Sequence, residues 1–187
     1  MQMNRRINNK KEVDDYINKI WEKYGNEKYP LHEAISNEDW RAVHVLLNYR
    51  WLDPNVVDDS GWNALHRVVW KPECSIVLFK SILSRIYDVN EPTLTGYEEP
   101  ALFTAARQGY TKFVKALMDE QKIDLNLMIN GLTALFLAAN NSHGDIVRLL
   151  YNDPRVDRNL GIYHNVYILD RWKEPLPHYS NEPTLRF

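Results

Sequence analysis

The 187-residue sequence has a single cysteine, Cys74, only seven glycines, and little excess charge of either sign. A lone cysteine excludes an intrachain disulfide and is compatible with a reducing compartment. The formal net charge of -2 provides no general electrostatic attraction for nucleic acid. No stretch approaches the roughly 18 apolar residues that a membrane helix needs. We therefore expect no nucleic-acid partner and no membrane span.

Motifs for catalysis and for cofactor or metal binding are also missing from the sequence. It contains no glycine-rich phosphate loop, no Cys-x-x-Cys pair and no His-Glu-x-x-His zinc motif. Residues 1–11 are polar and basic with no apolar stretch behind them, so we expect no secretory signal. The sequence predicts a cytoplasmic protein that is not an enzyme and holds no metal or cofactor.

Two short motifs recur in phase along the chain. The first motif begins with a leucine, and its copies stand 34, 37 and 33 residues apart, at Leu31, Leu65, Leu102 and Leu135. The second motif, Asp-x-Asn, follows each leucine after 22 or 23 residues, at Asp53, Asp88, Asp124 and Asp157. Because two independent motifs share one period, the chain consists of repeats of a single structural unit. We expect the recurring aspartates to form loops and turns rather than a catalytic set.

Each repeat shows the apolar spacing of two short helices. In the fourth copy, residues 141–144 form the expected turn between them. The apolar positions on the two sides of this turn are Leu135, Ala138, Ala139, Ile146, Val147, Leu149 and Leu150. One such helix pair cannot cover its own apolar face, so the copies must stack. The pattern predicts an all-α solenoid.

The recurring tracts resemble the ankyrin-repeat family. Its pattern, Asp-x-x-Gly-x-Thr-Pro-Leu-His-x-Ala, is matched best from Asp58 to Val68 and again from Gly131 to Ala138. The Thr-Pro pair is nowhere complete, and the segment 91–100 is longer than the family pattern. The resemblance covers about residues 29–160. It implies an all-α ankyrin-repeat solenoid of stacked antiparallel helix pairs with β-turn fingers.

The predicted organisation has three parts. They are an N-terminal capping helix within 1–28, ankyrin repeats over 29–160, and a degenerate cap with a C-terminal tail over 161–187. The repeat boundaries fall at about 29–61, 62–98, 99–131 and 132–160. Helical spacing of apolar residues places the first helix at residues 10–25, either as a cap or as a partner-binding helix. The stretch 166–169 is either a degenerate fifth repeat or a closing cap.

The resemblance also implies where a partner protein binds, because ankyrin proteins use the fingers and the surface of the first helices. The matching variable positions are Asp59, Ser60, Trp62, Trp70, Lys71, Tyr97, Glu99, Arg107, Gln108, Asn130, Leu132, Asn140 and Asn141. We expect Trp62 and Trp70 to be anchors, since tryptophan is enriched among interface hot spots. The alternative is that they pack on each other or under the long second finger. By the same resemblance, His32 and His66 form hydrogen bonds within their turns and are not metal ligands.

The expected function is protein–protein interaction by a small adaptor or inhibitor that is monomeric when free. One hypothesis is a microbial or viral effector that blocks a host protein, in which case it acts in the host cytosol. A second hypothesis is an immunity-type protein that neutralises a cognate toxin. A small enzyme or ligand sensor built on the solenoid is a third hypothesis, from a different class.

The repeat register predicts that Leu135→Asp destabilises the protein severely. The change puts a charge without a partner into the stack between the third and fourth copies. The expected loss is several kcal/mol, which is enough to unfold a marginally stable domain. Thermal unfolding of the variant and the parent checks this. Equal melting temperatures would show that the register is wrong.

Overall fold

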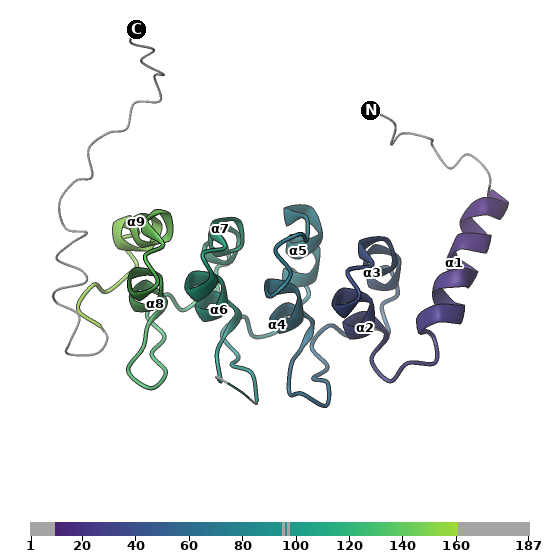
Figure 1. The fold of residues 1–187 in the computed structure, drawn as a ribbon, viewed down its shortest axis with the longest axis horizontal. Coiled ribbons are helices and arrows are strands. Elements are labelled where there is room, and N and C mark those ends of the chain that lie inside the picture. Colours follow the sequence, from purple (N-terminus) through teal and green to yellow (C-terminus); the bar gives the residue numbers. More distant parts are fainter. Residues whose placement is uncertain (1–9, 95, 97, 161–187) are drawn as a thin grey trace, which may run out of the picture.

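The structure is a computed structural model that describes residues 10–94, 96 and 98–160. These residues form an N-terminal helix, α1 (Lys10–Tyr24), and four pairs of shorter helices. The pairs are α2 (Pro30–Ser36) with α3 (Trp40–Leu47), α4 (Ala64–Val69) with α5 (Ile76–Leu83), α6 (Ala101–Gln108) with α7 (Thr111–Met118), and α8 (Ala134–Asn140) with α9 (Gly144–Asn152). The pairs stand in a row, and the loops between them project from one edge (Figure 1). This confirms the predicted all-α solenoid.

Side chains at the helix starts satisfy backbone N–H groups that the helices leave free. The N-cap side chains of α3, α4, α5 and α8 each accept a hydrogen bond from the third residue of their helix. These caps are Asp39, Asn63, Ser75 and Thr133. The paired helices are only 6 to 9 residues long, and helices of that length are unstable alone. They therefore depend on packing against their neighbours.

The core is continuous along the row of helices. Small residues line the inner helices, where Ala34, Ala105 and Ala138 are fully buried. The outer helices contribute larger side chains, and the rings of Phe79 and Phe113 stack with centroids 4.3 Å apart. This pairing joins the outer helices of the second and third pairs. Each pair buries its apolar face on the next one, as the repeat pattern predicts.

The Asp-x-Asn motifs form the turns that the sequence predicts and also link neighbouring repeats. Within each motif, an Asp Oδ1 atom accepts a hydrogen bond from the backbone N–H two residues later, at 2.9 Å in all four copies. The Asn55 amide then donates to the carbonyl of Arg85 at 2.9 Å and accepts from the N–H of Tyr87 at 2.8 Å. Asn90 and Asn126 make the same pair of bonds to the repeat that follows each of them. Three asparagines thus connect the loops of consecutive repeats.

Helix α1 packs against the first helix pair with its C-terminal half, where Ile20 and Tyr24 are buried. The Tyr24 hydroxyl donates a hydrogen bond to Asp39 at 3.1 Å, and Lys23 pairs with the same carboxylate at 3.0 Å. On the other side, the Trp21 ring stacks on Trp51 with centroids 5.2 Å apart. These contacts suit a capping role for α1. The predicted cap at 166–169 and the tail lie outside the described residues.

His66 lies in a hydrogen-bonded turn, as the family resemblance implies. Its backbone N–H donates to the Asn63 side chain at 3.0 Å, and its Nδ1 atom accepts from the Asn63 N–H at 3.3 Å. The Nε2 atom therefore carries the proton and donates to the carbonyl of Glu91 at 2.9 Å. Burial lowers the pKa of His66 and of the equivalent His32 below the ordinary histidine value.

These buried histidines predict that acid destabilises the fold well above the range in which carboxylates titrate. Their folded pKa values lie below the unfolded value of about 6.5, so the unfolded chain binds protons first as pH falls. We expect the contribution of the histidines to the free energy of unfolding to fall as pH drops below about 6.5 and to level off below their folded pKa values. Urea denaturation across this range, for the parent and His66→Gln, measures the effect.

His66→Gln should reduce the slope of stability against pH, whatever it does to stability itself. The matched control is His44→Gln, which removes an imidazole at an exposed position of α3. An identical slope in His66→Gln and the parent would contradict the prediction.

Candidate protein-binding surface

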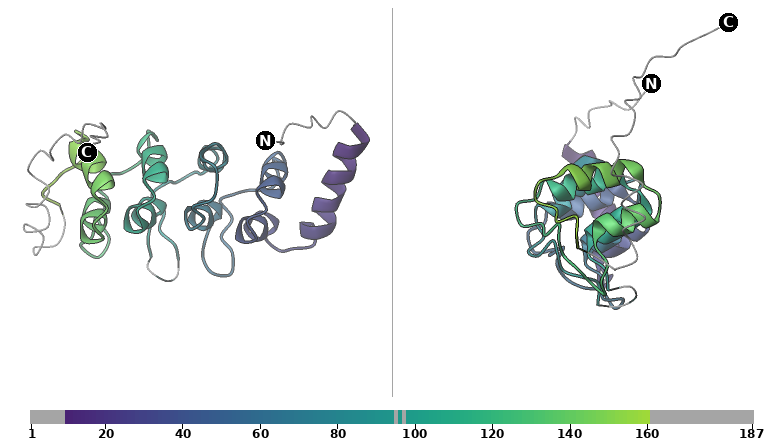
Figure 2. Two further views of the ribbon diagram at one scale, coloured as in Figure 1. Left: turned by 45° about the horizontal axis from the view of Figure 1, so that its top comes forward. Right: turned by 90° about the vertical axis from the view of Figure 1, so that its left-hand side faces the viewer.

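The candidate surface is the face made by the inner helices α2, α4, α6 and α8 together with the fingers (Figures 1 and 2). A finger is the loop that leads from one helix pair to the next. The inner helices lie beside the fingers, while α3, α5, α7 and α9 form the outer layer. Most of the residues predicted to bind a partner lie on this face, at finger positions or near the ends of inner helices.

Trp62 and Trp70 form the aromatic part of the surface. Trp62 follows Gly61 in the finger, and Trp70 is the C-cap residue of α4. Their rings stack with centroids 6.2 Å apart and an interplanar angle of 19°. Both side chains stay partly exposed. The tryptophans thus pack on each other, which is one of the alternatives that the sequence left open, and they also face solvent.

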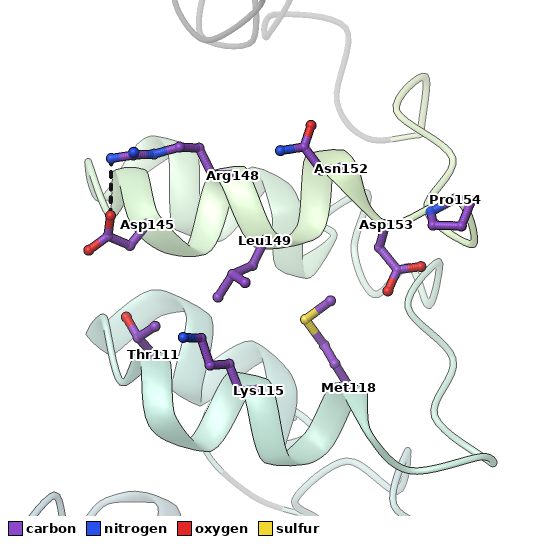
Figure 3. A pocket seen from close by; sticks show the side chains of 9 residues that line it. All are labelled: Thr111, Lys115, Met118, Asp145, Arg148, Leu149, Asn152, Asp153 and Pro154. Carbon is purple, nitrogen blue, oxygen red and sulfur yellow. Dashed lines mark hydrogen bonds and ion pairs between the residues drawn. The ribbon is translucent and has the colours of Figure 1, made fainter. Parts of the chain in front are cut away.

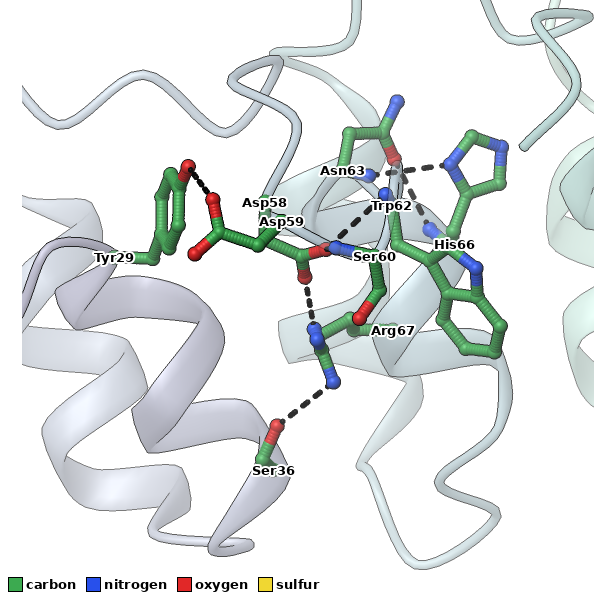
Figure 4. A network of polar contacts seen from close by, with 9 residues as sticks. All are labelled: Tyr29, Ser36, Asp58, Asp59, Ser60, Trp62, Asn63, His66 and Arg67. Carbon is green, nitrogen blue, oxygen red and sulfur yellow. Dashed lines mark hydrogen bonds and ion pairs between the residues drawn. The ribbon is translucent and has the colours of Figure 1, made fainter. Parts of the chain in front are cut away.

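A buried carboxylate holds the finger that carries Trp62 (Figure 4). Asp58 is only 7% exposed. Its Oδ1 atom accepts hydrogen bonds from the N–H groups of Ser60 at 2.8 Å and Trp62 at 3.3 Å, and its other oxygen pairs with Arg67. Burial alone would raise the pKa of Asp58, but the hydrogen bonds from Arg67, Ser60 and Trp62 outweigh it and lower that pKa. The Asp58 carboxylate therefore orients the backbone that carries Trp62.

Arg67 connects this carboxylate to the aromatic pair and to the preceding repeat. Its guanidinium lies 5.8 Å from the centroid of the Trp62 ring, within the range of a cation–π contact. Its Nη1 atom donates to the Ser36 hydroxyl on α2 at 3.3 Å (Figure 4). Sequence analysis missed Arg67, although it stands three residues before Trp70 and therefore lies on the same side of α4.

Other charged residues of the predicted set are also paired. The exposed Asp59 accepts from Lys28 at 2.7 Å and from the Tyr29 hydroxyl at 3.0 Å. Lys71 pairs with Glu38 of the preceding repeat at 2.9 Å.

Glu99 and Arg107 form a further ion pair on this face. Glu99 is only 5% exposed, and its carboxylate pairs with Arg107 on α6. Glu99 thus holds Arg107 in place and presents little surface of its own.

The remaining predicted residues lie farther along the row. Gln108 is partly exposed at the end of α6, and Leu132 is partly exposed in the last finger. The exposed members are Asn130, Asn140 and Asn141. Tyr97 lies outside the described residues. The predicted residues of the fourth repeat, three exposed asparagines and Leu132, therefore lie apart from the tryptophans of the second repeat.

The exposed apolar side chains that sequence analysis missed on the fingers include Leu94 and Met128. Leu94 is 62% exposed and Met128 is 52% exposed. The N–H of Leu94 donates to the carbonyl of Gly61 at 3.0 Å, which joins two successive fingers. The segment 91–100 departs from the family spacing, so alignment could not place Leu94 next to Gly61.

A groove of about 750 Å³ lies on the outer layer between α7 and α9 (Figure 3). Met118 and Leu149 contribute its apolar part, and Lys115 and the ion pair of Asp145 with Arg148 contribute its charged part. The groove lies away from the predicted partner-binding residues. The described residues contain no group of three or more histidine, cysteine, aspartate or glutamate side chains placed to hold a metal ion.

Two further features of the described residues are the state of the cysteine thiol and the length of the helices. Burial raises the pKa of the Cys74 thiol to about 11, so the reactive thiolate is scarce at neutral pH. Across residues 10–160, apart from the two that are not described, no helix is both long and apolar enough to cross a membrane.

Comparisons with known proteins support the fold. Residues 73–160 match a family model for ankyrin repeats in 3 copies. The structure is similar to an ankyrin repeat domain from Acinetobacter baumannii AYE, with a TM-score of 0.56 and 28% sequence identity. The similarity covers 66% of this chain and 61% of that chain. No curated protein has a significantly similar sequence.

The contacts of Asp58 predict that Asp58→Asn destabilises the second repeat. The change leaves the partly buried Arg67 without its carboxylate partner, which we expect to cost about 1–3 kcal/mol. The matched control is Asp59→Asn, next to it in the same finger. Its ion pair is exposed, so the change should matter much less. Urea denaturation of both variants checks this, and equal effects would contradict the role given to Asp58.

Proposed function

Because this chain has the ankyrin-repeat fold, we propose that it binds another protein through the finger and inner-helix face. Ankyrin repeats generally mediate protein–protein interaction. The protein would act as a small adaptor or inhibitor that occupies a surface of its partner, with no bond made or broken. The observation that carries this proposal is the partly exposed pair Trp62 and Trp70 on that face.

The aromatic pair has the properties of an interface anchor. Tryptophan offers a large apolar surface and is enriched among residues that dominate binding energy. Trp62 and Trp70 are already stacked in the free protein. The Asp58 side chain also accepts a hydrogen bond from the backbone N–H of Trp62, which fixes the backbone at this residue. Binding of a partner would therefore cost little free energy for ordering these two side chains.

The charges around the pair indicate which kind of contact dominates. Arg67 is paired with Asp58, Lys71 with Glu38, and Lys28 with Asp59. Since each cation already has an anionic neighbour, the surface near the tryptophans offers no strong excess of either sign. We propose that the partner contributes apolar or aromatic side chains at this point. Its affinity should then depend only weakly on ionic strength.

The proposal predicts that Trp62→Ala and Trp70→Ala each weaken binding by about 2 kcal/mol or more, the size of a hot-spot effect. The partner would first be isolated by pull-down and identified by mass spectrometry, and its affinity for each variant measured by titration calorimetry. Melting curves recorded alongside should show that both variants remain folded, because partly exposed anchors contribute less to the stack than core residues do.

The control is Val77→Ala, in the same repeat but on the outer helix α5, where Val77 is 77% exposed. This variant should bind as the parent does. Unchanged affinity in both tryptophan variants would place the binding surface elsewhere on the protein. A melting temperature far below that of the parent would instead show that the tryptophans belong to the core.

A further inference from the structure

The finger between α7 and α8 ends in a two-residue turn. The N–H of Ile129 donates to the carbonyl of Leu132 at 3.1 Å, and the N–H of Leu132 donates to the carbonyl of Ile129 at 2.9 Å. Between them, Asn130 has a φ of 52° and Gly131 a φ of 76°. Two successive residues with positive φ are typical of a type I′ turn, which strongly favours the dipeptide Asn-Gly. Local backbone geometry therefore explains why this dipeptide stands here.

The same dipeptide carries an electrophile next to an unhindered nucleophile. The side-chain carbonyl carbon of Asn130 can be attacked by the backbone nitrogen of Gly131, and that approach is least obstructed when the following residue has no Cβ atom. Asn130 is the only asparagine of the sequence that is followed by glycine. It is exposed, and neither its side chain nor the N–H of Gly131 forms a hydrogen bond with another described residue.

Two other asparagines of the same region, Asn126 and Asn141, are held by hydrogen bonds. The Asn126 amide donates to the carbonyl of Arg155 at 2.7 Å and accepts from the N–H of Asp157 at 2.6 Å. The Asn141 amide donates to the carbonyl of Leu137 at 2.8 Å. In both cases the next residue carries a side chain, Leu127 or Ser142. Asn130 thus differs from its neighbours in both bonding and steric access.

We propose that Asn130 is a site of spontaneous deamidation in the folded protein. The Gly131 nitrogen forms a bond to the side-chain carbonyl carbon of Asn130 and gives up its proton to a base from solvent. The bond from that carbon to the side-chain nitrogen breaks, and ammonia leaves. Water then adds to one of the two carbonyls of the five-membered succinimide ring and opens it. The product is aspartate or isoaspartate at position 130, with no oxidant or reductant involved.

Both products change the tip of this finger. Each adds one negative charge where the surface has a neutral amide. Isoaspartate also inserts the former side-chain carbon into the backbone, which is incompatible with the two-residue turn. The reaction needs no partner protein, so it stands whether or not the proposed binding function is correct.

The test is to incubate the folded protein at mildly alkaline pH and follow it by peptide mass spectrometry. Trypsin releases residues 123–148 as one fragment, which contains Asn126, Asn130, Asn140 and Asn141. The expected result is the mass increase of amide-to-acid conversion on this fragment, localised by fragment ions to Asn130. Conversion there should be several-fold faster than at the other three asparagines together. Its rate should rise with hydroxide concentration, because the attacking nitrogen must lose its proton.

Two controls make the outcome decisive. Asn130→Gln should abolish the conversion at this position, because its longer side chain closes a less favourable ring. The unfolded protein in urea shows how fast the same peptide reacts without the turn. If Asn130 keeps its amide in the folded protein but converts to the acid in urea, the proposal is wrong. Earlier conversion at Asn126, Asn140 or Asn141 would overturn it as well.

Discussion

Burial of apolar surface between consecutive helix pairs is the interaction on which the rest of the structure depends. Each pair consists of helices too short to persist in water, and fully buried residues such as Ala105 and Leu117 on the two helices of one pair find part of their packing on the neighbouring pairs. Polar contacts also join consecutive repeats. Arg85 donates to the carbonyls of Leu47 and Leu52 of the preceding repeat, so side chains of one repeat complete the helix end and loop of another. Stability is therefore a property of interfaces between repeats.

This arrangement separates the residues that make the fold from those free to make a surface. The stack uses the faces that the helix pairs turn toward each other. Trp62 and Trp70 lie at the edge of the second repeat and remain partly exposed, and Trp70 also packs against the core. Two large aromatic side chains on such a surface expose apolar area that folding alone does not explain. The function proposed above assigns this exposed area to contact with a partner.

The sequence predicts the repeat register and the helices well, because both depend on short-range spacing. The leucine tract and the Asp-x-Asn motif each occur once in every repeat, so the role inferred for one copy applies to the others. The double hydrogen bond of Asn55 to Arg85 and Tyr87 could not be predicted in the same way. It joins residues some thirty positions apart, and the motif shows only that Asn55 is repeated. The burial of Glu99 was missed for a related reason, since it depends on how the long segment 91–100 folds back toward Arg107.

The ion pairs of the surface also bear on how a partner could be selected. Arg67 bonds to Asp58 and Ser36 and lies over Trp62, so it cannot turn toward a partner without leaving a buried carboxylate unpaired. That loss would be costly, and Arg67 is therefore held in its present geometry. The Glu38 side chain is 46% exposed, against 4% for Asp58, so Lys71 and Glu38 can exchange partners at little cost. Under the proposed function, selection of a partner would rest on shape and apolar contact at the fixed centre of this surface, with adjustable charges at its edge.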